Sequence, residues 1–316
     1  MGALLGSGEF RYEEQLDWAR LPEGVSLRET PDIVVGPDDR VYVFTRGDHK
    51  MLVFSPEGEL LSTWGADIFA RPHGVSLSHD CTLWCVDDGD HTVRRCTLDG
   101  QVLLTLGIAG RPAPAGSGQP FNRPTKVAEE PGTHNLYISD GYGNAKVHKF
   151  TPQGKRLFSW GDYGTGPGEF NLVHMVATDP EGLVYVADRE NHRVQIFDPE
   201  GNYLREWRHH LHRPCGLYIS AEGLVYIGQL GPTIAVNREY PNLGARVSIH
   251  DLTGKQLAWI GGMHPGLGPG QFLAPHGVAV DARGDIYVGE VSYTDYGRHQ
   301  DPPREVQSLR KLVRLR

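Results

Sequence analysis

Short runs of alternating apolar and polar residues, separated by turns that contain Gly or Pro, recur along the whole chain. In the clearest copy, residues 184–201, two apolar segments flank a polar turn and a Gly-containing turn follows. Similar copies begin at Val41, Leu83 and Leu136, and weaker copies begin at Val225 and Ile286. Alternation with a period of two is typical of β-strands, and turns this short join antiparallel neighbours. The pattern therefore predicts an all-β protein built from repeated antiparallel sheets.

Each copy is preceded by a short apolar segment, and six such segments open at intervals of 41 to 61 residues. They open at Pro31, Pro72, Pro124, Val173, Pro214 and Pro275. Four strands per repeat are typical of a propeller blade. We therefore predict a single six-bladed β-propeller domain over residues 1–316, with NHL-like blades at approximately 29–65, 71–107, 123–161, 172–208, 213–262 and 274–316. The last copy lacks a fourth strand, so we expect residues 12–20 to join that blade and close the ring.

Composition agrees with many short elements joined by tight turns. The chain has 316 residues, of which 40 are Gly and 22 are Pro, and 39% of its residues are hydrophobic. This much Gly and Pro excludes a coiled coil, while the hydrophobic content excludes a disordered chain. Growth by repetition also explains how one domain reaches this length.

Charge and cysteine content restrict the setting and the partners. The formal net charge is −8, and the main basic cluster lies at the end of the chain, from Arg310 onward, so we expect no nucleic-acid partner. Apolar stretches are far shorter than a membrane span, so we expect no membrane partner either. Four cysteines are too few for a secreted disulfide framework. We therefore expect a cytoplasmic protein.

The main chemical signal is the residue that follows each opening position. In chain order these residues are Asp32, His73, Thr125, His174, Cys215 and His276. The first strands of a propeller line its central channel, and alternate blades lie one third of a turn apart. Three imidazoles with a coordination position left open are the arrangement of a catalytic zinc site. We predict that His73, His174 and His276 bind Zn²⁺ or another divalent transition metal.

Two neighbouring features allow a plainer interpretation. Cys215 is either a fourth, soft ligand or a small residue of the channel, and we favour the second. The segment His209 to His212 lies on the connection to the fifth blade and is interpreted as a solvated loop.

A second set of residues follows the ends of the second strands, on the face where the histidines are expected. It comprises Arg46, Asp88, Tyr142, Arg189, Val291 and Tyr293. Arginine recognises anionic groups, and tyrosine transfers protons, so this set suits an anionic substrate held near a metal. The ordinary alternative is that these arginines form surface ion pairs.

These motifs resemble known families. The segments 186–194, 164–170 and 266–272 resemble the NHL repeats of six-bladed β-propellers. The motifs around the three histidines and around Arg46, Tyr142 and Arg189 resemble those of peptidyl-α-hydroxyglycine α-amidating lyase. That resemblance implies a three-histidine zinc site at His73, His174 and His276, with Tyr142 as the catalytic base and Arg46 and Arg189 as active-site cations. It also implies cleavage of a C–N bond, with release of an amide and glyoxylate.

The departures from that family change the expected substrate. Gly277 stands where the family has an acidic calcium ligand after the third histidine, so calcium is not expected. Gly143 stands where the family has a half-cystine beside the tyrosine, and the loop after Arg46 is shorter. We therefore expect a metal-dependent lyase or hydrolase that acts on a small, anionic, α-hydroxylated or carboxylated molecule. The loops at 108–121 and 229–246 are expected to shape its specificity.

Two other functions remain open at this point. One is a non-catalytic NHL propeller that serves as a protein-binding platform. The other is a lactonase-like propeller hydrolase, although such sites rely on carboxylate and Asn ligands for a hard ion, whereas imidazole favours zinc, copper or iron.

Overall fold

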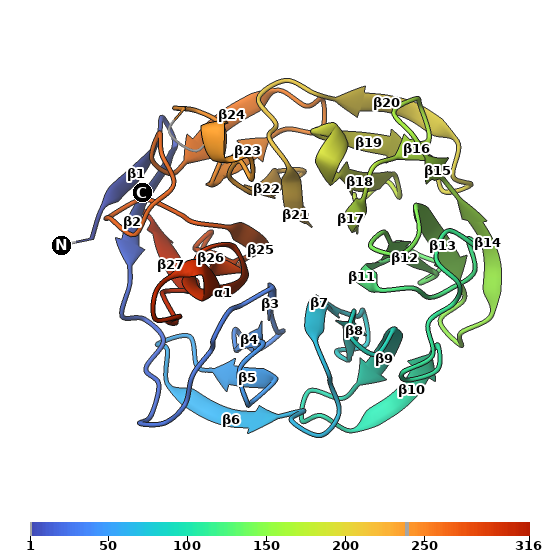
Figure 1. Cartoon of the computed structure of the whole chain (residues 1–316), viewed down its shortest axis with the longest axis horizontal. Helices are drawn as coiled ribbons and strands as arrows, with labels where there is room; N and C mark the ends of the chain where they lie inside the picture. Colours follow the sequence, from blue (N-terminus) through green and yellow to red (C-terminus); the bar gives the residue numbers. More distant parts are fainter. Residues whose placement is uncertain (1, 238–239) are drawn as a thin grey trace. The chain divides into compact units, whose positions relative to one another are not determined.

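The computed structural model describes residues 2–237 and 240–316, and this part of the chain is dominated by β-strands (Figure 1). Apart from two N-terminal strands and a short ribbon, the strands follow the predicted repeat of six blades. The predicted fold class is confirmed: the chain is an all-β, six-bladed β-propeller whose last blade is completed by an N-terminal strand.

The bounds of the strands follow the repeat closely. The first blade has β3 (Asp32–Val35), β4 (Val41–Phe44), β5 (Met51–Phe54) and β6 (Leu60–Trp64). The second has β7 (Pro72–Leu77), β8 (Leu83–Asp87), β9 (Thr92–Cys96) and β10 (Val102–Leu106). The third has β11 (Pro124–Glu129), β12 (Leu136–Asp140), β13 (Lys146–Phe150) and β14 (Arg156–Trp160). The fourth has β17 (Val173–Thr178), β18 (Val184–Asp188), β19 (Arg193–Phe197) and β20 (Tyr203–Trp207).

The last two blades and the accessory elements complete the chain. The fifth blade has β21 (Pro214–Ile219), β22 (Val225–Gln229), β23 (Arg246–His250) and β24 (Gln256–Ile260). The sixth has β25 (Pro275–Val280), β26 (Ile286–Glu290) and β27 (Leu309–Arg314), together with β2 (Phe10–Gln15) and β1 (Leu4–Ser7). A parallel ribbon joins β15 (Asp162–Tyr163) to β16 (Glu169–Phe170). The helical elements are α1 (Ser292–Asp295), η1 (Arg189–Asn191), η2 (Ala235–Asn237) and η3 (Gly297–His299).

The chain divides into two compact units. The terminal unit comprises Met1–Ala66 and Leu224–Arg316, and the middle unit comprises Asp67–Gly223. The expectation of one domain over the whole chain stays a prediction. Within residues 2–237 and 240–316, no helix has the length and apolar character required to cross a bilayer.

In the middle unit, neighbouring blades contact each other through their first strands, β7 with β11, β11 with β17, and β17 with β21. Apolar side chains fill the space between blades, as where Trp84 and Val86 of the second blade pack with Ile138 of the third and with Phe121 of the connecting loop. Each such fully buried side chain contributes about 1.5–3 kcal/mol. The first strands, which carry the opening residues, are therefore held by well-packed neighbours.

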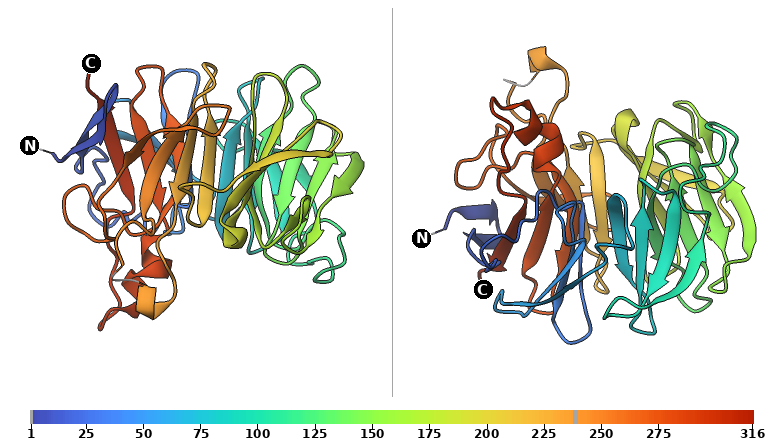
Figure 2. Two further views of the ribbon diagram at one scale, coloured as in Figure 1. Left: turned by 90° about the horizontal axis from the view of Figure 1, so that it is seen from above. Right: turned by 60° about the horizontal axis from the view of Figure 1, so that its bottom comes forward.

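In the terminal unit, β2 pairs antiparallel with β27, with Tyr12 opposite Arg314 (Figure 2). The buried Arg310 guanidinium strengthens this junction, because it forms ion pairs with Glu14 of β2 and Glu290 of β26. The expected N-terminal strand is thus present, although it covers Phe10–Gln15 and is followed outward by a further strand, β1.

Candidate active site

Two of the three predicted metal ligands lie side by side in the middle unit. His73 and His174 stand at the second positions of β7 and β17, and both are fully buried. Their ring centroids are 5.0 Å apart. Each Nε2 lies 3.2 Å from the hydroxyl oxygen of Tyr142. The middle unit therefore brings His73, His174 and Tyr142 together.

All three predicted ligands are held by the same kind of contact at the other ring nitrogen. In the middle unit, Nδ1 of His73 lies 2.8 Å from the backbone oxygen of Thr125, and Nδ1 of His174 lies 3.2 Å from that of Cys215. In the terminal unit, Nδ1 of His276 lies 2.6 Å from the backbone oxygen of Pro31.

These contacts assign the protons of the imidazoles. A carbonyl oxygen can only accept, so each Nδ1 donates its hydrogen and Nε2 is left as the basic nitrogen. Metal-binding histidines usually donate their second N–H in this way, which fixes the tautomer and the ring orientation. The three side chains are thus prepared as Nε2 ligands by the chain's own backbone.

The donor set in the middle unit fits a divalent cation. One hydroxyl proton on Tyr142 can serve only one imidazole lone pair at a time, yet the basic Nε2 atoms of both His73 and His174 point at this oxygen. Two neutral imidazoles and a phenol oxygen that converge in this way suit zinc and its neighbours among the transition metals.

Tyr142 is also surrounded by positive charge. The guanidinium of Arg123 lies over its ring, 4.4 Å from the centroid, and Nη1 of Arg189 lies 3.4 Å from its hydroxyl oxygen. Burial opposes the charge of Arg189, but Tyr142, Cys215 and Glu190 favour it, and together they raise the pKa of Arg189. Arg189 therefore stays cationic and can stabilise negative charge on the Tyr142 oxygen.

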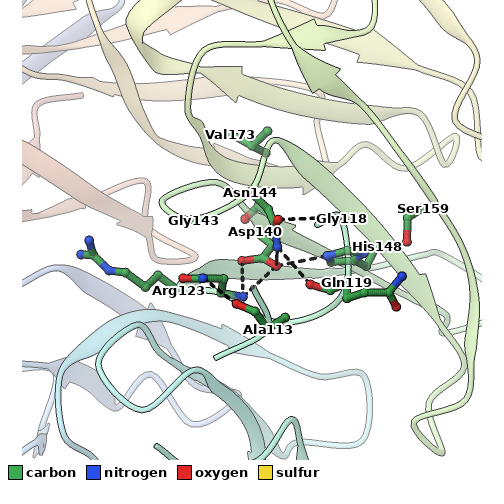
Figure 3. Close-up of polar contacts among 12 residues, drawn as sticks. Ala113, Gly118, Gln119, Arg123, Asp140, Gly143, Asn144, His148, Ser159 and Val173 are labelled. Atoms are coloured by element: carbon green, nitrogen blue, oxygen red, sulfur yellow. Dashed lines mark hydrogen bonds and ion pairs between the residues drawn. The ribbon is translucent and has the colours of Figure 1, made fainter. Parts of the chain in front are cut away.

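A buried carboxylate positions the loop that carries Tyr142 (Figure 3). Asp140, the last residue of β12, accepts hydrogen bonds from the backbone N–H of Asn122, from the side-chain amide of Asn144 at 2.8 Å and from Nε2 of His148 at 3.2 Å. The side-chain oxygen of Asn144 in turn accepts from the backbone N–H of Gly118, in the loop at 108–121. The loop expected to shape specificity therefore packs on the segment that presents Tyr142.

Equivalent carboxylates hold the segments that lead into the histidine-bearing strands. Asp87 accepts from the backbone N–H groups of Ala70 and Arg71, just before His73. Asp188 accepts a hydrogen bond from the backbone N–H of Asn171. Glu290 accepts hydrogen bonds from the backbone N–H groups of Leu273 and Ala274. In each of the three repeats that carry a predicted histidine ligand, an acidic residue at the end of the second strand thus fixes the entry of the first strand.

The two glycines that flank Tyr142 are required by close contacts. A Cβ at Gly141 would lie 1.8 Å from the backbone oxygen of Val173, and a Cβ at Gly143 would lie 2.1 Å from the side-chain oxygen of Asn122. Position 143 therefore cannot hold a half-cystine unless Asn122 moves. Likewise, a Cβ at Gly277 would lie 2.5 Å from Cα of Asp32, which disfavours an acidic residue there.

We predict that Gly141→Ala lowers stability by about 1–3 kcal/mol or more, because the new Cβ meets backbone atoms that cannot rotate away. It should also reduce turnover, since displacing a reacting group by about 1 Å costs about 10²-fold in rate. Thermal denaturation and steady-state kinetics measure both effects. Gly166→Ala is the matched control in the same unit, because its nearest neighbours belong to the flexible Glu169 side chain. Equal melting temperatures for the two variants would contradict this packing argument.

A set of arginines that precede opening prolines supports the site and was not predicted from the sequence. Arg71 and Arg123 both pair with the buried carboxylate of Asp88, and Arg213 pairs with Glu190, which also holds Arg189. The signal in the sequence is an arginine directly before three of the five opening prolines, Pro72, Pro124 and Pro214. Asp88 thus acts on the site indirectly, by placing Arg123 over Tyr142. Cys215 packs against His174, with its sulfur 3.2 Å from Nδ1.

Arg46, the second predicted cation, lies in the terminal unit. Its guanidinium forms a buried ion pair with Glu29, with a distance of 2.8 Å between Nη1 and Oε1. Burial disfavours the charge of Glu29, but Arg46 and two hydrogen bonds from Thr294 outweigh it and lower the pKa of Glu29. Arg46 is thus fixed in place by a carboxylate that Thr294 orients.

A cavity of about 460 Å³ lies beside this pair, also in the terminal unit. Its lining includes Thr233, His264, Thr294, Asp295, Arg298 and His299. The segments that carry α1 and η2 project from the same side of this unit (Figure 2). The loop at 229–246 contributes part of the wall, and Thr294 connects the cavity to the pair of Glu29 and Arg46.

Comparisons with known proteins agree with the repeat. A family model described as "NHL repeat" matches residues 170–197. Peptidyl-alpha-hydroxyglycine alpha-amidating lyase 1 of Drosophila melanogaster is 32% identical over 256 residues, which cover 74% of this chain and 45% of that protein. Peptidyl-glycine alpha-amidating monooxygenase A of Xenopus laevis is 26% identical over 346 residues, 96% of this chain and 35% of that protein. The chain spans 24% to 37% of the length of the amidating monooxygenases that it matches.

Solved structures support the fold. A streptogramin B lyase superposes with a TM-score of 0.61 at 12% identity, covering 98% of this chain and 97% of that one. A gluconolactonase from Xanthomonas campestris superposes with a TM-score of 0.61 at 13% identity, covering 97% of this chain and 90% of that one.

Proposed function

We propose that this chain, an NHL-repeat six-bladed β-propeller that resembles peptidyl-α-hydroxyglycine α-amidating lyase, is a metal-dependent lyase for small α-hydroxylated carboxylates. The related proteins include enzymes named as lyases, which supports an enzymatic propeller. The observation that carries the proposal is the shared anchoring of His73, His174 and His276, each by Nδ1 on a backbone carbonyl.

The metal would be held by Nε2 of the three histidines. When bound, such an ion supplies Lewis acidity toward an oxygen of the substrate. The identical tautomer and the equivalent position in alternate repeats support the inclusion of His276 with the other two.

Tyr142 is the group that would move the proton. In the proposed reaction its phenolate takes the proton of the substrate hydroxyl, the C–O bond becomes a carbonyl, and the electron pair of the C–N bond leaves with nitrogen. The proton then passes from Tyr142 to that nitrogen. The products are a primary amide and a two-carbon oxo acid, glyoxylate, and no other reactant is consumed.

Two arginines would stabilise the negative charges in the proposed reaction. Arg189 would stabilise Tyr142 as a phenolate, because its guanidinium already donates a hydrogen bond to the Tyr142 hydroxyl oxygen. We assign Arg46 to the substrate carboxylate, because Glu29 holds its guanidinium in a fixed orientation. The cavity of the terminal unit would take the part of the substrate remote from the reacting carbon, since it offers both apolar and cationic walls.

A cytoplasmic setting is part of this proposal. It rests on the cysteine content of the sequence, because four cysteines are too few for a secreted disulfide framework.

The proposal predicts turnover of an N-acyl-α-hydroxyglycine to the acyl amide and glyoxylate. The two products should form in equal amounts, with mass spectrometry detecting the amide and a coupled reductase assay detecting glyoxylate. Dialysis against a chelator should stop the reaction, and added Zn²⁺ should restore it. Hydrolysis of a lactone or ester in place of C–N cleavage would favour the lactonase-like alternative, and no turnover of either class would favour a binding platform.

A further inference from the structure

A second group of potential metal ligands lies in the middle unit, away from the histidines of the proposed active site. We propose that His79, Glu129 and His134 form a surface site for a divalent transition metal of the zinc class. Their ligand atoms all lie within 4.8 Å of one another. This site goes beyond the proposed function and does not depend on it.

The geometry of the two imidazoles carries the proposal. Nδ1 of His79 and Nδ1 of His134 both contact the same oxygen of Glu129, Oε1, the second at 2.8 Å. The rings stack with their centroids 3.5 Å apart and their planes 14° from parallel. The stack therefore turns both nitrogens toward one point beside one carboxylate.

The chemistry of this set suits zinc. Two histidines and one carboxylate are a ligand set that zinc uses, and the remaining positions can hold water. Bonds of about 2.0–2.1 Å in a tetrahedral site separate neighbouring ligand atoms by about 3.3 Å. Small rotations of His79 and His134, whose side chains are 43% and 37% exposed, would open the cluster to that spacing. An ion would then replace the two N–H protons that now face Glu129.

The carboxylate is held in place by residues behind it. Oε2 of Glu129 accepts a hydrogen bond from the hydroxyl of Ser78 at 2.6 Å, and Ser78 is buried. The backbone oxygen of Glu129 accepts from the hydroxyl of Thr178 at 2.8 Å. A ligand fixed by a second layer of hydrogen bonds is the usual construction of a metal site.

The fold brings the three residues together from two neighbouring strand ends. His79 lies in the turn after β7, Glu129 is the last residue of β11, and His134 lies in the turn after β11. The strands β7 and β11 contact each other. His73 lies near the start of β7 and His79 lies six residues later, just beyond its end, which corresponds to about 20 Å of extended chain. The surface site and the histidines of the proposed active site are therefore separate and should bind independently.

Zinc binding to the purified full chain tests this proposal. After removal of metals with a chelator, equilibrium dialysis against Zn²⁺ with mass-spectrometric metal analysis should show one equivalent more for the wild type than for His79→Ala or His134→Ala. His209→Ala is the matched control, because His209 is exposed and outside the cluster, and it should keep the wild-type stoichiometry. Ser78→Ala leaves all three ligands in place but should lower the affinity of this site for Zn²⁺ by about 10-fold or more.

A second readout assigns the ion to these side chains. Zn²⁺ should protect His79 and His134 from modification by diethylpyrocarbonate, and it should do so equally in His174→Ala, in which the proposed active site is damaged. Equal zinc stoichiometry in the wild type, His79→Ala and His134→Ala would overturn the proposal, as would modification of both rings at the same rate with and without Zn²⁺. Loss of turnover in His174→Ala with this protection retained would separate the two sites.

Discussion

Replacing Tyr142 by Phe should reduce kcat for the α-hydroxylated substrate by about 10²–10⁴-fold, the usual contribution of a positioned acid–base group. The hydroxyl is the only part of the side chain that changes, and it is the atom on which Nε2 of His73, Nε2 of His174 and Nη1 of Arg189 converge. The ring would still pack beneath Arg123, so the fold should be retained.

Steady-state kinetics and circular dichroism on the same samples separate these effects. Tyr203→Phe is a suitable control, because Tyr203 is a partly buried tyrosine of the same unit that packs against an apolar cluster. Its kcat should match that of the wild type. If Tyr142→Phe also turned over substrate at the wild-type rate, another group would have to move the proton.

Replacing any one of His73, His174 and His276 by Ala should reduce turnover by about 10³-fold or more, since a Lewis-acid metal contributes several kcal/mol to catalysis. The three losses should be similar in size, because residues that act as one unit are strongly non-additive. A double variant should therefore be little worse than each single variant.

The same kinetic assay distinguishes the loss of a metal ligand from a nonspecific effect of replacing a histidine. His209→Ala alters a histidine outside the proposed ligand set and should keep full activity. Loss of activity in the variants at His73 and His174 but normal activity in His276→Ala would mean that the histidine of the terminal unit has no part in the reaction.

The repeat made most of the fold predictable from sequence. Alternation with a period of two and regularly spaced opening positions determine the blades, and the missing fourth strand of the last copy indicated that the N-terminal segment would complete it. The bounds of that segment were less accurate. The outer strand β1 has the sequence Leu-Leu-Gly-Ser and is mostly exposed, so it carries no alternation of apolar and polar residues that could predict it.

The candidate site was predictable only where it follows the repeat. Equivalent positions in alternate blades revealed the histidines, and the ends of the second strands revealed Tyr142 and Arg189. The contact of Arg123 with Tyr142 could not be predicted, because Arg123 precedes the repeat position that carries the histidines and is placed over the ring by its ion pair with Asp88. The contacts that hold Arg46 could not be predicted for a different reason. Glu29, its ion-pair partner, is oriented by Thr294, which lies 265 residues away in the sequence and meets Glu29 only in the folded chain. The pair of His79 and His134 lies in two unlike turns and follows no period.

Metal content tests the central claim, a metal centre of three histidines, most directly. The measurement is zinc per chain after exhaustive dialysis, made in the His79→Ala background so that the surface site does not contribute. The account predicts about one zinc per chain in that background, the number of ions a three-histidine site holds, and none when His73, His174 or His276 is also replaced by Ala. Full zinc content in the chain that lacks both His79 and His276 would contradict it.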